Sequence, residues 1–220
     1  MLALGALGHP NENPSVMHST KQRLIDAGLR MLLEQGYNSL GIQALLEATD
    51  TPKGSFYHHF RDKEDFALQV IDAYMVGVHA GLDACLLDGA LAPLARIRRF
   101  FEMTQESYRQ EGYLGCLMGG LGQELSGVSE VFRRKIDWCL SSISERMAKC
   151  LAQAQRNGEI PATSNVQEMA DLLVDCWEGA ALRSRLRRNP TSLNAMLDFY
   201  INSVAAGAQT AAGEQPRTLS

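Results

Sequence analysis

Apolar residues recur at helical spacing along almost the whole chain, and this periodicity constrains the fold more than any other feature of the sequence. In residues 19–36, for example, leucines and an isoleucine recur three or four positions apart, as on one face of a helix. No run of alternating apolar and polar residues lies between turn residues, as a half-buried strand would. The pattern therefore predicts an all-α protein of about nine helices.

Three helices are expected at the start of this pattern. The first is capped by Ser19 or Thr20 and ends at Gly36, and the second and third are short. Ser39 is expected to cap the second, which covers residues 41–48. A Thr-Pro break then precedes the third, over residues 53–60, because proline is favoured at the first turn of a helix.

The same pattern divides the chain into four parts. Residues 1–18 have no periodicity and are expected to form a disordered leader, with Met17 as an alternative start. Residues 19–66 are expected to form a small helical domain, and residues 67–208 a larger domain of longer helices. Residues 209–220 are expected to be a flexible tail.

Composition narrows the class of protein. Of 220 residues, 45% are apolar and 21% are charged, which suits a soluble globular protein. The five cysteines are scattered and have no histidine at metal-ligand spacing, so we expect reduced thiols in the cytoplasm and neither a metal nor a cofactor. No apolar run is long enough to span a membrane. The formal net charge of -4 gives no general attraction to nucleic acid, so any such function must rest on local features.

Residues 41–60 have the pattern of two short helices separated by a tight polar turn. This is the helix-turn-helix arrangement, whose second helix enters the major groove of DNA. Phe56 and Phe60 would hold that helix to the domain and leave its opposite face free. Between positions 51 and 63, three basic residues oppose one acidic residue, so the local field is positive. Taken singly, each polar residue here is equally well explained as a solvated side chain.

Residues 51–66 resemble the signature of the TetR family of repressors; they read Thr51-Pro-Lys-Gly-Ser-Phe-Tyr-His-His-Phe-Arg-Asp-Lys-Glu-Asp-Phe66. The resemblance covers residues 19–66. It implies a three-helix DNA-binding domain and a larger helical domain, residues 67–208, for ligand binding and dimerisation. Implied partners are a double-stranded DNA operator, a small-molecule inducer and a second copy of the chain. By position, Ser39, Gln43, Thr51 and Lys63 resemble phosphate or groove-edge contacts, and Lys53, Gly54, Ser55, Tyr57 and His58 resemble recognition-helix contacts.

A weaker resemblance extends into residues 115–125 and 176–183. It points to the branch that includes the acrylate-sensing and N-ethylmaleimide-sensing repressors. Cys116 falls at the position of the reactive cysteine in the electrophile sensor. That branch often has a basic arm before the first helix, whereas residues 1–18 contain no lysine or arginine. Extra anchoring in the minor groove by such an arm is therefore not expected.

The chemistry of Cys116 leaves two roles open. A reactive thiol needs positive neighbours or a helix N-terminus to lower its pKa, and no basic residue lies between Gln110 and Arg133. The alternative is a small buried hydrophobic residue. Candidates to line an apolar ligand pocket, each of which also suits ordinary core, are Tyr113, Met103, Met118 and Trp177, with Arg96 as a candidate to receive a ligand carboxylate.

These observations favour a dimeric repressor that binds a palindromic operator and is released by a small molecule, with acrylate-like compounds and electrophiles as candidates. The last two helices, over residues 165–188 and 191–206, are expected to form the dimer interface, since two half-sites need two matched reading heads. One rival is a thiol-dependent enzyme using Cys116, although no histidine follows His79. The other is a helical adaptor that binds protein, which salt-dependent DNA binding would exclude.

Overall fold

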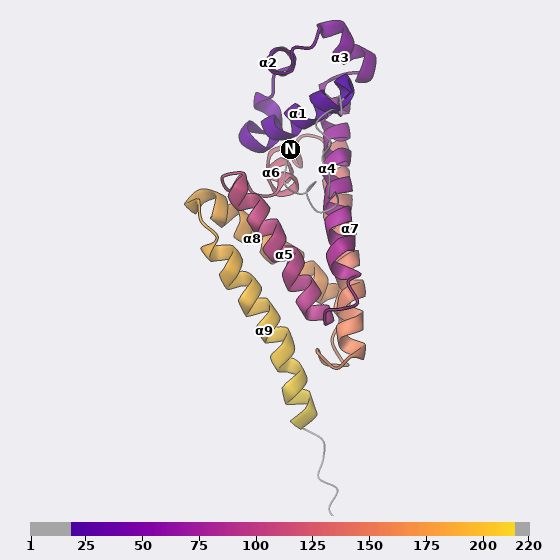
Figure 1. Ribbon diagram of the computed structural model, residues 1–220, viewed down its shortest axis with the longest axis vertical. Helices are drawn as coiled ribbons and strands as arrows, with labels where there is room; N and C mark the ends of the chain where they lie inside the picture. The colour runs from indigo at the N-terminus through magenta and orange to yellow at the C-terminus, as the bar shows by residue number, and fades with distance from the viewer. Residues whose placement is uncertain (1–18, 214–220) are drawn as a thin grey trace, which may run out of the picture.

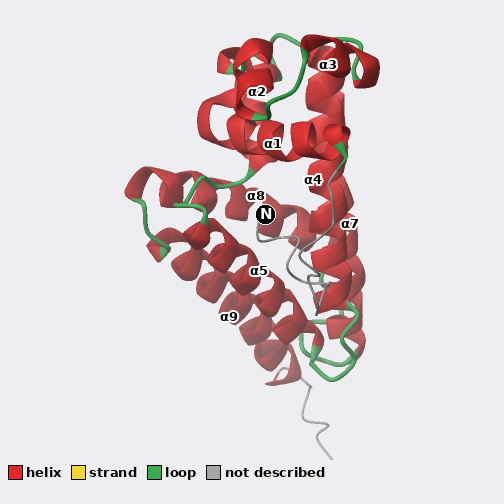
Figure 2. Ribbon diagram, turned by 45° about the horizontal axis from the view of Figure 1, so that its top comes forward, coloured by secondary structure: helices red, strands yellow, loops and turns green. Residues whose placement is uncertain are grey.

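The computed structural model describes residues 19–213, with side chains to residue 205, and this range contains nine helices and no strand (Figures 1 and 2). The all-α prediction is confirmed for this part of the chain. The predicted leader, residues 1–18, lies outside the described residues. The helices are α1 (Thr20–Ser39), α2 (Ile42–Ala48), α3 (Lys53–His59), α4 (Lys63–Leu86), α5 (Pro93–Gln110), α6 (Leu117–Leu125), α7 (Glu130–Arg156), α8 (Val166–Arg187) and α9 (Thr191–Gly213).

Helix α1 begins as predicted, because the Ser19 side chain accepts a hydrogen bond from the Gln22 N–H at 3.2 Å. Gly36 interrupts it with a φ of 79°, a left-handed conformation that favours glycine. A last short turn follows and ends at Ser39. The prediction that Ser39 caps α2 was wrong, because Gly41 is the N-cap and no side chain bonds there.

Helices α1 to α3 are held together by an aromatic cluster. Phe56 of α3 lies 5.1 Å from Phe60 and 5.4 Å from Phe66 between ring centroids, and all three rings are buried. Gly28 of α1 allows this packing, since a Cβ there would lie 2.3 Å from the Phe66 ring. The cluster therefore fixes α3 against α1 and the start of α4, which sets the direction in which the opposite face of α3 points.

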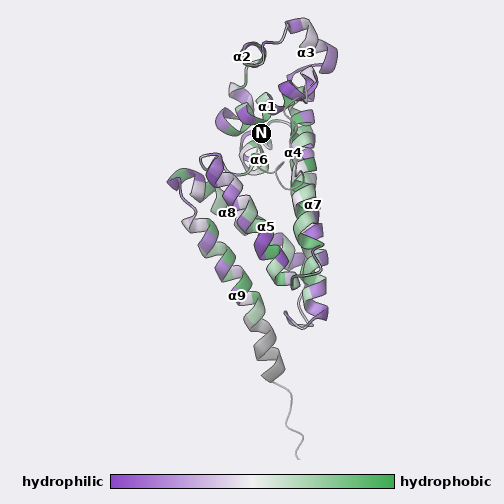
Figure 3. Cartoon of the chain, in the orientation of Figure 1, coloured by the Kyte–Doolittle hydropathy of each residue, from purple (hydrophilic) through white to green (hydrophobic). Residues whose placement is uncertain are grey.

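Helix α4 joins the small N-terminal group of helices to the larger one (Figure 1). Asp62 caps it: its Oδ1 accepts a hydrogen bond from the Asp65 N–H at 2.8 Å. Along its length α4 packs against α1, then α5 and α7. Hydrophobic residues are frequent along α4 in Figure 3, and ten residues of this helix are buried. Helix α4 therefore packs against both domains along its length.

The large domain contains one helix that sequence periodicity did not separate. The glycine-rich segment around Cys116 forms α6, which packs against α1 and α7. Helix α9 continues to Gly213, beyond the predicted start of the tail at residue 209; residues 214–220 are outside the described range.

Helices α8 and α9 pack on each other and leave large apolar side chains uncovered in the single chain. The uncovered side chains on these two helices are Leu172, Leu182, Leu186 and Phe199, of which Phe199 is 75% exposed.

Within residues 19–213, each helix is too short or too polar to cross a bilayer.

Candidate nucleic-acid interface and ligand cavity

The outer face of α3 carries four of the predicted DNA contacts. Lys53, Gly54, Tyr57 and His58 are exposed, whereas Phe56 faces the core. Tyr57 is half exposed and its ring lies 5.2 Å from that of Phe56, which supports it from below. The helix thus has one face fixed in the domain and one free to enter a groove.

The other predicted contacts lie around this face with different exposure. Ser39 and Gln43 are exposed, and the Gln43 amide donates to Glu47 at 2.9 Å. Ser55 is partly buried, and Thr51 is only 6% exposed. The Thr51 hydroxyl donates to the backbone oxygen of Thr49 at 3.2 Å, so it also stabilises the turn between α2 and α3.

Lys63 lies where α4 meets the bend between α1 and α2. Its Nζ is 4.5 Å from the centre of the Tyr37 ring and donates to the backbone oxygen of Asn38 at 3.4 Å. Partial burial lowers the pKa of its ammonium group, and the nearby Glu124 opposes this shift. In the free protein, Lys63 therefore holds elements together in addition to any contact with DNA.

A cavity of about 220 Å³ opens between α6 and α8. Cys116, the N-cap residue of α6, lies on its wall. Gly115 has a φ of 81° and brings the chain to within 3.7 Å, measured from an ideal Cβ, of the Ala181 backbone oxygen on α8. The full lining is Leu114, Gly115, Cys116, Gly119, Gly120, Gln123, Glu178, Ala181, Leu182 and Arg185.

Glu178 dominates the electrostatics of this cavity. Burial raises the pKa of its carboxyl group to about 7, and the neighbouring Cys116 opposes this rise. Burial also raises the pKa of the Cys116 thiol well above its ordinary value, and the Glu178 charge raises it further. The backbone N–H groups of Gly119 and Met118 act in the opposite direction but do not outweigh these causes. Cys116 is therefore a protonated thiol at neutral pH.

Two tyrosines lie beneath this pair. The Tyr74 hydroxyl is 4.0 Å from Cys116 Sγ, and burial raises its pKa well above its ordinary value. Burial raises the pKa of Tyr108 in the same way. Both side chains are therefore neutral at pH 7, and Arg185, which lines the cavity, is not among the causes of the shift in the Cys116 pKa.

Three of the predicted pocket residues lie in or against the core near Cys116 but do not line the cavity. Met118 is fully buried, and Trp177 packs its ring 4.5 Å from that of Phe101. Tyr113 has a φ of 61° and donates its backbone N–H to Tyr108 at 2.6 Å. These residues shape the wall behind the cavity rather than its surface.

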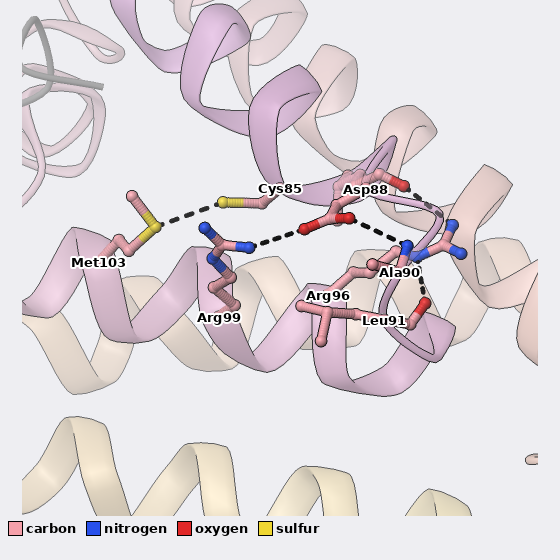
Figure 4. Close-up of polar contacts among 8 residues, drawn as sticks. Cys85, Asp88, Ala90, Leu91, Arg96, Arg99 and Met103 are labelled. Atoms are coloured by element: carbon pink, nitrogen blue, oxygen red, sulfur yellow. Dashed lines mark hydrogen bonds and ion pairs between the residues drawn. The ribbon is translucent and has the colours of Figure 1, made fainter. Parts of the chain in front are cut away.

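Met103 and Arg96 lie elsewhere, near the turn between α4 and α5 (Figure 4). The Cys85 thiol donates to Met103 Sδ at 3.5 Å. The Arg96 guanidinium donates to the backbone oxygens of Leu91 at 2.7 Å and Leu86 at 3.2 Å, and to the Gln153 side chain at 2.8 Å. Through these hydrogen bonds, Arg96 stabilises the turn between α4 and α5. Arg96 lies near neither Cys116 nor the cavity.

Sequence reasoning missed Glu178 and Arg185. Glu178 follows Glu168, Asp171 and Asp175 at helical spacing along α8, so the sequence has no signal that separates it from these exposed acidic residues. Arg185 belongs to a run of four arginines at the end of α8, a pattern typical of a solvated helix end. In the structure its guanidinium donates to the Leu114 backbone oxygen at 3.0 Å and reaches that of Glu34 at 3.5 Å.

Known proteins with the same arrangement are regulators. The bacterial regulatory protein domain of the tetR family matches residues 24–70, and the tetracyclin repressor-like C-terminal domain matches residues 93–200. Transcriptional regulator AcuR of Cereibacter sphaeroides is 41% identical over 191 residues, 86% of each chain. HTH-type transcriptional repressor NemR of Escherichia coli is 27% identical over 197 residues, 89% of this chain and 99% of NemR.

Solved structures agree with these matches. The regulatory protein TetR from Rhodobacter sphaeroides is 40% identical, with a TM-score of 0.80 over 83% of this chain and 97% of that one. The reduced form of E. coli NemR is 28% identical, with a TM-score of 0.77 over 84% and 96%. The resemblance seen in residues 51–66 is confirmed by this similarity along most of the chain. The chain belongs to the TetR family of bacterial regulatory proteins.

Proposed function

We propose that this protein is a repressor that binds a palindromic operator as a dimer in the cytoplasm and is released when a small molecule occupies the cavity beside Cys116. The observation that carries the DNA-binding part is α3: Phe56 anchors one face while Lys53, Tyr57 and His58 extend from the other. Dimerisation supplies the second reading head that a two-fold operator requires.

The inducer part rests on the cavity. About 220 Å³ is enough for a compound of a few heavy atoms, and the lining combines a thiol, a carboxyl group and a guanidinium with apolar and glycine surface. An inducer releases DNA only to the extent that it binds the released conformation more tightly than the DNA-bound one. An electrophile would do this by forming a covalent bond with Cys116 Sγ.

The DNA-binding part is tested by selecting bound sequences from random DNA and measuring affinity at several salt concentrations. Lys53→Ala should reduce the slope of log affinity against log salt by about 1, because the interface loses one cationic side chain. Tyr57→Ala should weaken binding and leave the slope unchanged. Lys149→Ala, which removes an exposed lysine from α7, is the matched control and should change neither. Salt-independent binding, or no selected sequence, contradicts the proposal.

The inducer part is tested separately by adding acrylate, N-ethylmaleimide and small aldehydes to the operator complex. Release of DNA by an electrophile should be lost in Cys116→Ser. Release that survives this change would contradict covalent sensing and leave a cavity that binds its ligand non-covalently.

A further inference from the structure

A single carboxylate holds the bend between α1 and α2 from outside the DNA-binding domain. Glu124 of α6 accepts a hydrogen bond at Oε2 from the Tyr37 N–H at 2.8 Å and at Oε1 from the Asn38 N–H at 2.6 Å. Hydrogen bonds between backbone N–H groups and a carboxylate are about twice as strong as those between neutral groups. The contact joins residues 87 positions apart in the chain, so it is a tertiary link and not part of a local turn.

The backbone is shaped to receive this carboxylate. Gly36 has a φ of 79°, and a Cβ at that position would lie 2.6 Å from Glu124 Oε2. Only glycine therefore allows both the left-handed turn and the close approach of the side chain. The left-handed turn at Gly36, the bend that follows it and the position of the Glu124 carboxylate therefore depend on one another.

Neighbouring contacts hold the same bend against the other helices. The Tyr37 ring packs edge-on against Phe132 of α7, with 5.0 Å between centroids. Lys63, at the start of α4, places its Nζ over the Tyr37 ring and donates to the Asn38 backbone oxygen. The bend is thus the point where α1, α4, α6 and α7 meet, directly before α2 and α3.

The same short helix that carries Glu124 also forms a wall of the cavity. Cys116 is the N-cap of α6, and Gly119, Gly120 and Gln123 line the cavity along it. Helix α6 has nine residues and lies beneath α1 in Figure 1. Cys116 and Glu124 therefore lie at opposite ends of one short helix. Arg185 adds a second link, since it lines the cavity and its guanidinium reaches the Glu34 backbone oxygen on α1.

We propose that Glu124 is a positioning residue: its carboxylate sets the pose of α2 and α3 and transmits movement of α6 from the cavity to the DNA-reading surface. This inference rests on the proposed function for its ligand-dependent part. In the unliganded protein, Glu124 holds the bend in the DNA-binding pose. When a group fills the cavity beside Cys116, α6 shifts, the two hydrogen bonds lengthen and the reading helices lose their spacing.

The first test needs neither operator nor inducer. Hydrogen exchange of the Tyr37 and Asn38 amides is compared in the unmodified protein and in Glu124→Ala, where exchange should be at least about tenfold faster. Glu124→Gln keeps one acceptor oxygen and should give an intermediate rate. Glu34→Gln is the control, because it removes a carboxylate on α1 whose ion-pair partner is the exposed Arg30. Equal exchange in all four proteins would overturn the proposal.

The second test measures coupling in a Cys176→Ser background, where Cys116 is the only cysteine that is not buried. N-ethylmaleimide is added until the intact mass shows one adduct: a bond forms between Cys116 Sγ and a ring carbon, the C=C bond opens, and the thiol proton is transferred to the adjacent carbon. Operator Kd is then compared with and without the adduct. The adduct should weaken binding about fivefold or more when Glu124 is present, and less than about twofold in Glu124→Ala.

The two possible failures are distinguishable. Equal coupling in the presence and absence of Glu124 overturns the inference and leaves the proposed function intact. No effect of the adduct on operator binding in the Glu124 protein overturns the role of the cavity in induction; the exchange rates and operator affinities of the unmodified proteins then decide whether Glu124 positions the reading helices.

Discussion

Cys116 and Glu178 meet at the cavity from two different helices, and each changes the ionisation of the other. Burial raises the pKa of both groups, to about 7 for the Glu178 carboxyl, and the carboxylate charge adds to the rise at the thiol. A sequence comparison alone suggests a reactive cysteine, which requires a lowered thiol pKa. Burial is the larger cause of the raised thiol pKa, and the Glu178 carboxylate adds to it, so Glu178 opposes formation of the thiolate rather than promoting it.

Replacing this carboxylate should make Cys116 more reactive. In Glu178→Gln the charge that raises the thiol pKa is gone, so the thiolate fraction at pH 8 increases, and alkylation by N-ethylmaleimide should be several-fold faster. The rate is measured by intact mass in the Cys176→Ser background. Asp171→Asn, on an exposed position of the same helix, is the control and should leave the rate unchanged. A slower reaction in Glu178→Gln would instead identify Glu178 as the base that accepts the thiol proton.

The raised carboxyl pKa also predicts a pH dependence of stability. From pH 4.5, the ordinary value, to about pH 7, the folded protein retains the Glu178 proton that the unfolded chain releases. The free energy of unfolding therefore falls as the pH rises through this window, by up to about 3 kcal/mol. Glu178→Gln should match the parent protein at pH 4 and be more stable at pH 8. Urea unfolding at fixed protein concentration measures both, and a pH-independent difference would contradict the prediction.

Two adjacent glycines of α6 give a matched test of the cavity wall. A Cβ at Gly119 would lie 2.3 Å from Glu178 Oε2, whereas a Cβ at Gly120 would have no heavy atom within 4 Å. Gly119→Ala should therefore displace the Glu178 carboxylate, and this cost should leave the protein less stable than Gly120→Ala does. Gly120→Ala should stabilise it by about 0.5–1 kcal/mol, since alanine is the better helix former. Chemical denaturation of the two variants measures the difference; equal effects would mean that Glu178 does not pack on Gly119.

Structural features that depend on residues close together in the chain could be predicted from the sequence. Ser19 is predicted as an N-cap, and its side chain accepts a backbone hydrogen bond at the start of α1. Asp62, Ser129 and Asn165 are of the residue types favoured at N-caps, and they accept such bonds at the start of α4, α7 and α8. An N-cap can be predicted from the sequence because the backbone N–H that it bonds lies only two or three residues further along the chain. Ser39 was misassigned because the left-handed turn at Gly36 lets α1 resume for a further turn, and this resumption depends on tertiary contacts.

The cavity could not be predicted because its walls come from distant segments. A methionine or tryptophan at helical spacing has the same pattern whether it lines a pocket or fills the core, so Met103 and Trp177 could not be distinguished from Cys116 as pocket residues. Likewise, Glu124 is simply an acidic residue on a short helix until the fold places two N–H groups of α1 against it. The role of Glu124 depends on the packing of α6 against α1, and the cavity lining depends on the position of α8 beside α6. Neither arrangement can be read from the sequence.

The uncovered face of α8 and α9 gives the last prediction. Phe199 is 75% exposed on α9, although a phenylalanine side chain gains roughly 1.5–3 kcal/mol when it is fully buried. If this face is the dimer interface, Phe199→Asp should convert the protein to a monomer and weaken operator binding, because a single reading head occupies only one half-site. Val76→Asp is the control: Val76 is 71% exposed but lies on α4, outside the predicted interface. Light scattering gives the mass of each variant, and a dimeric Phe199→Asp protein would place the interface elsewhere.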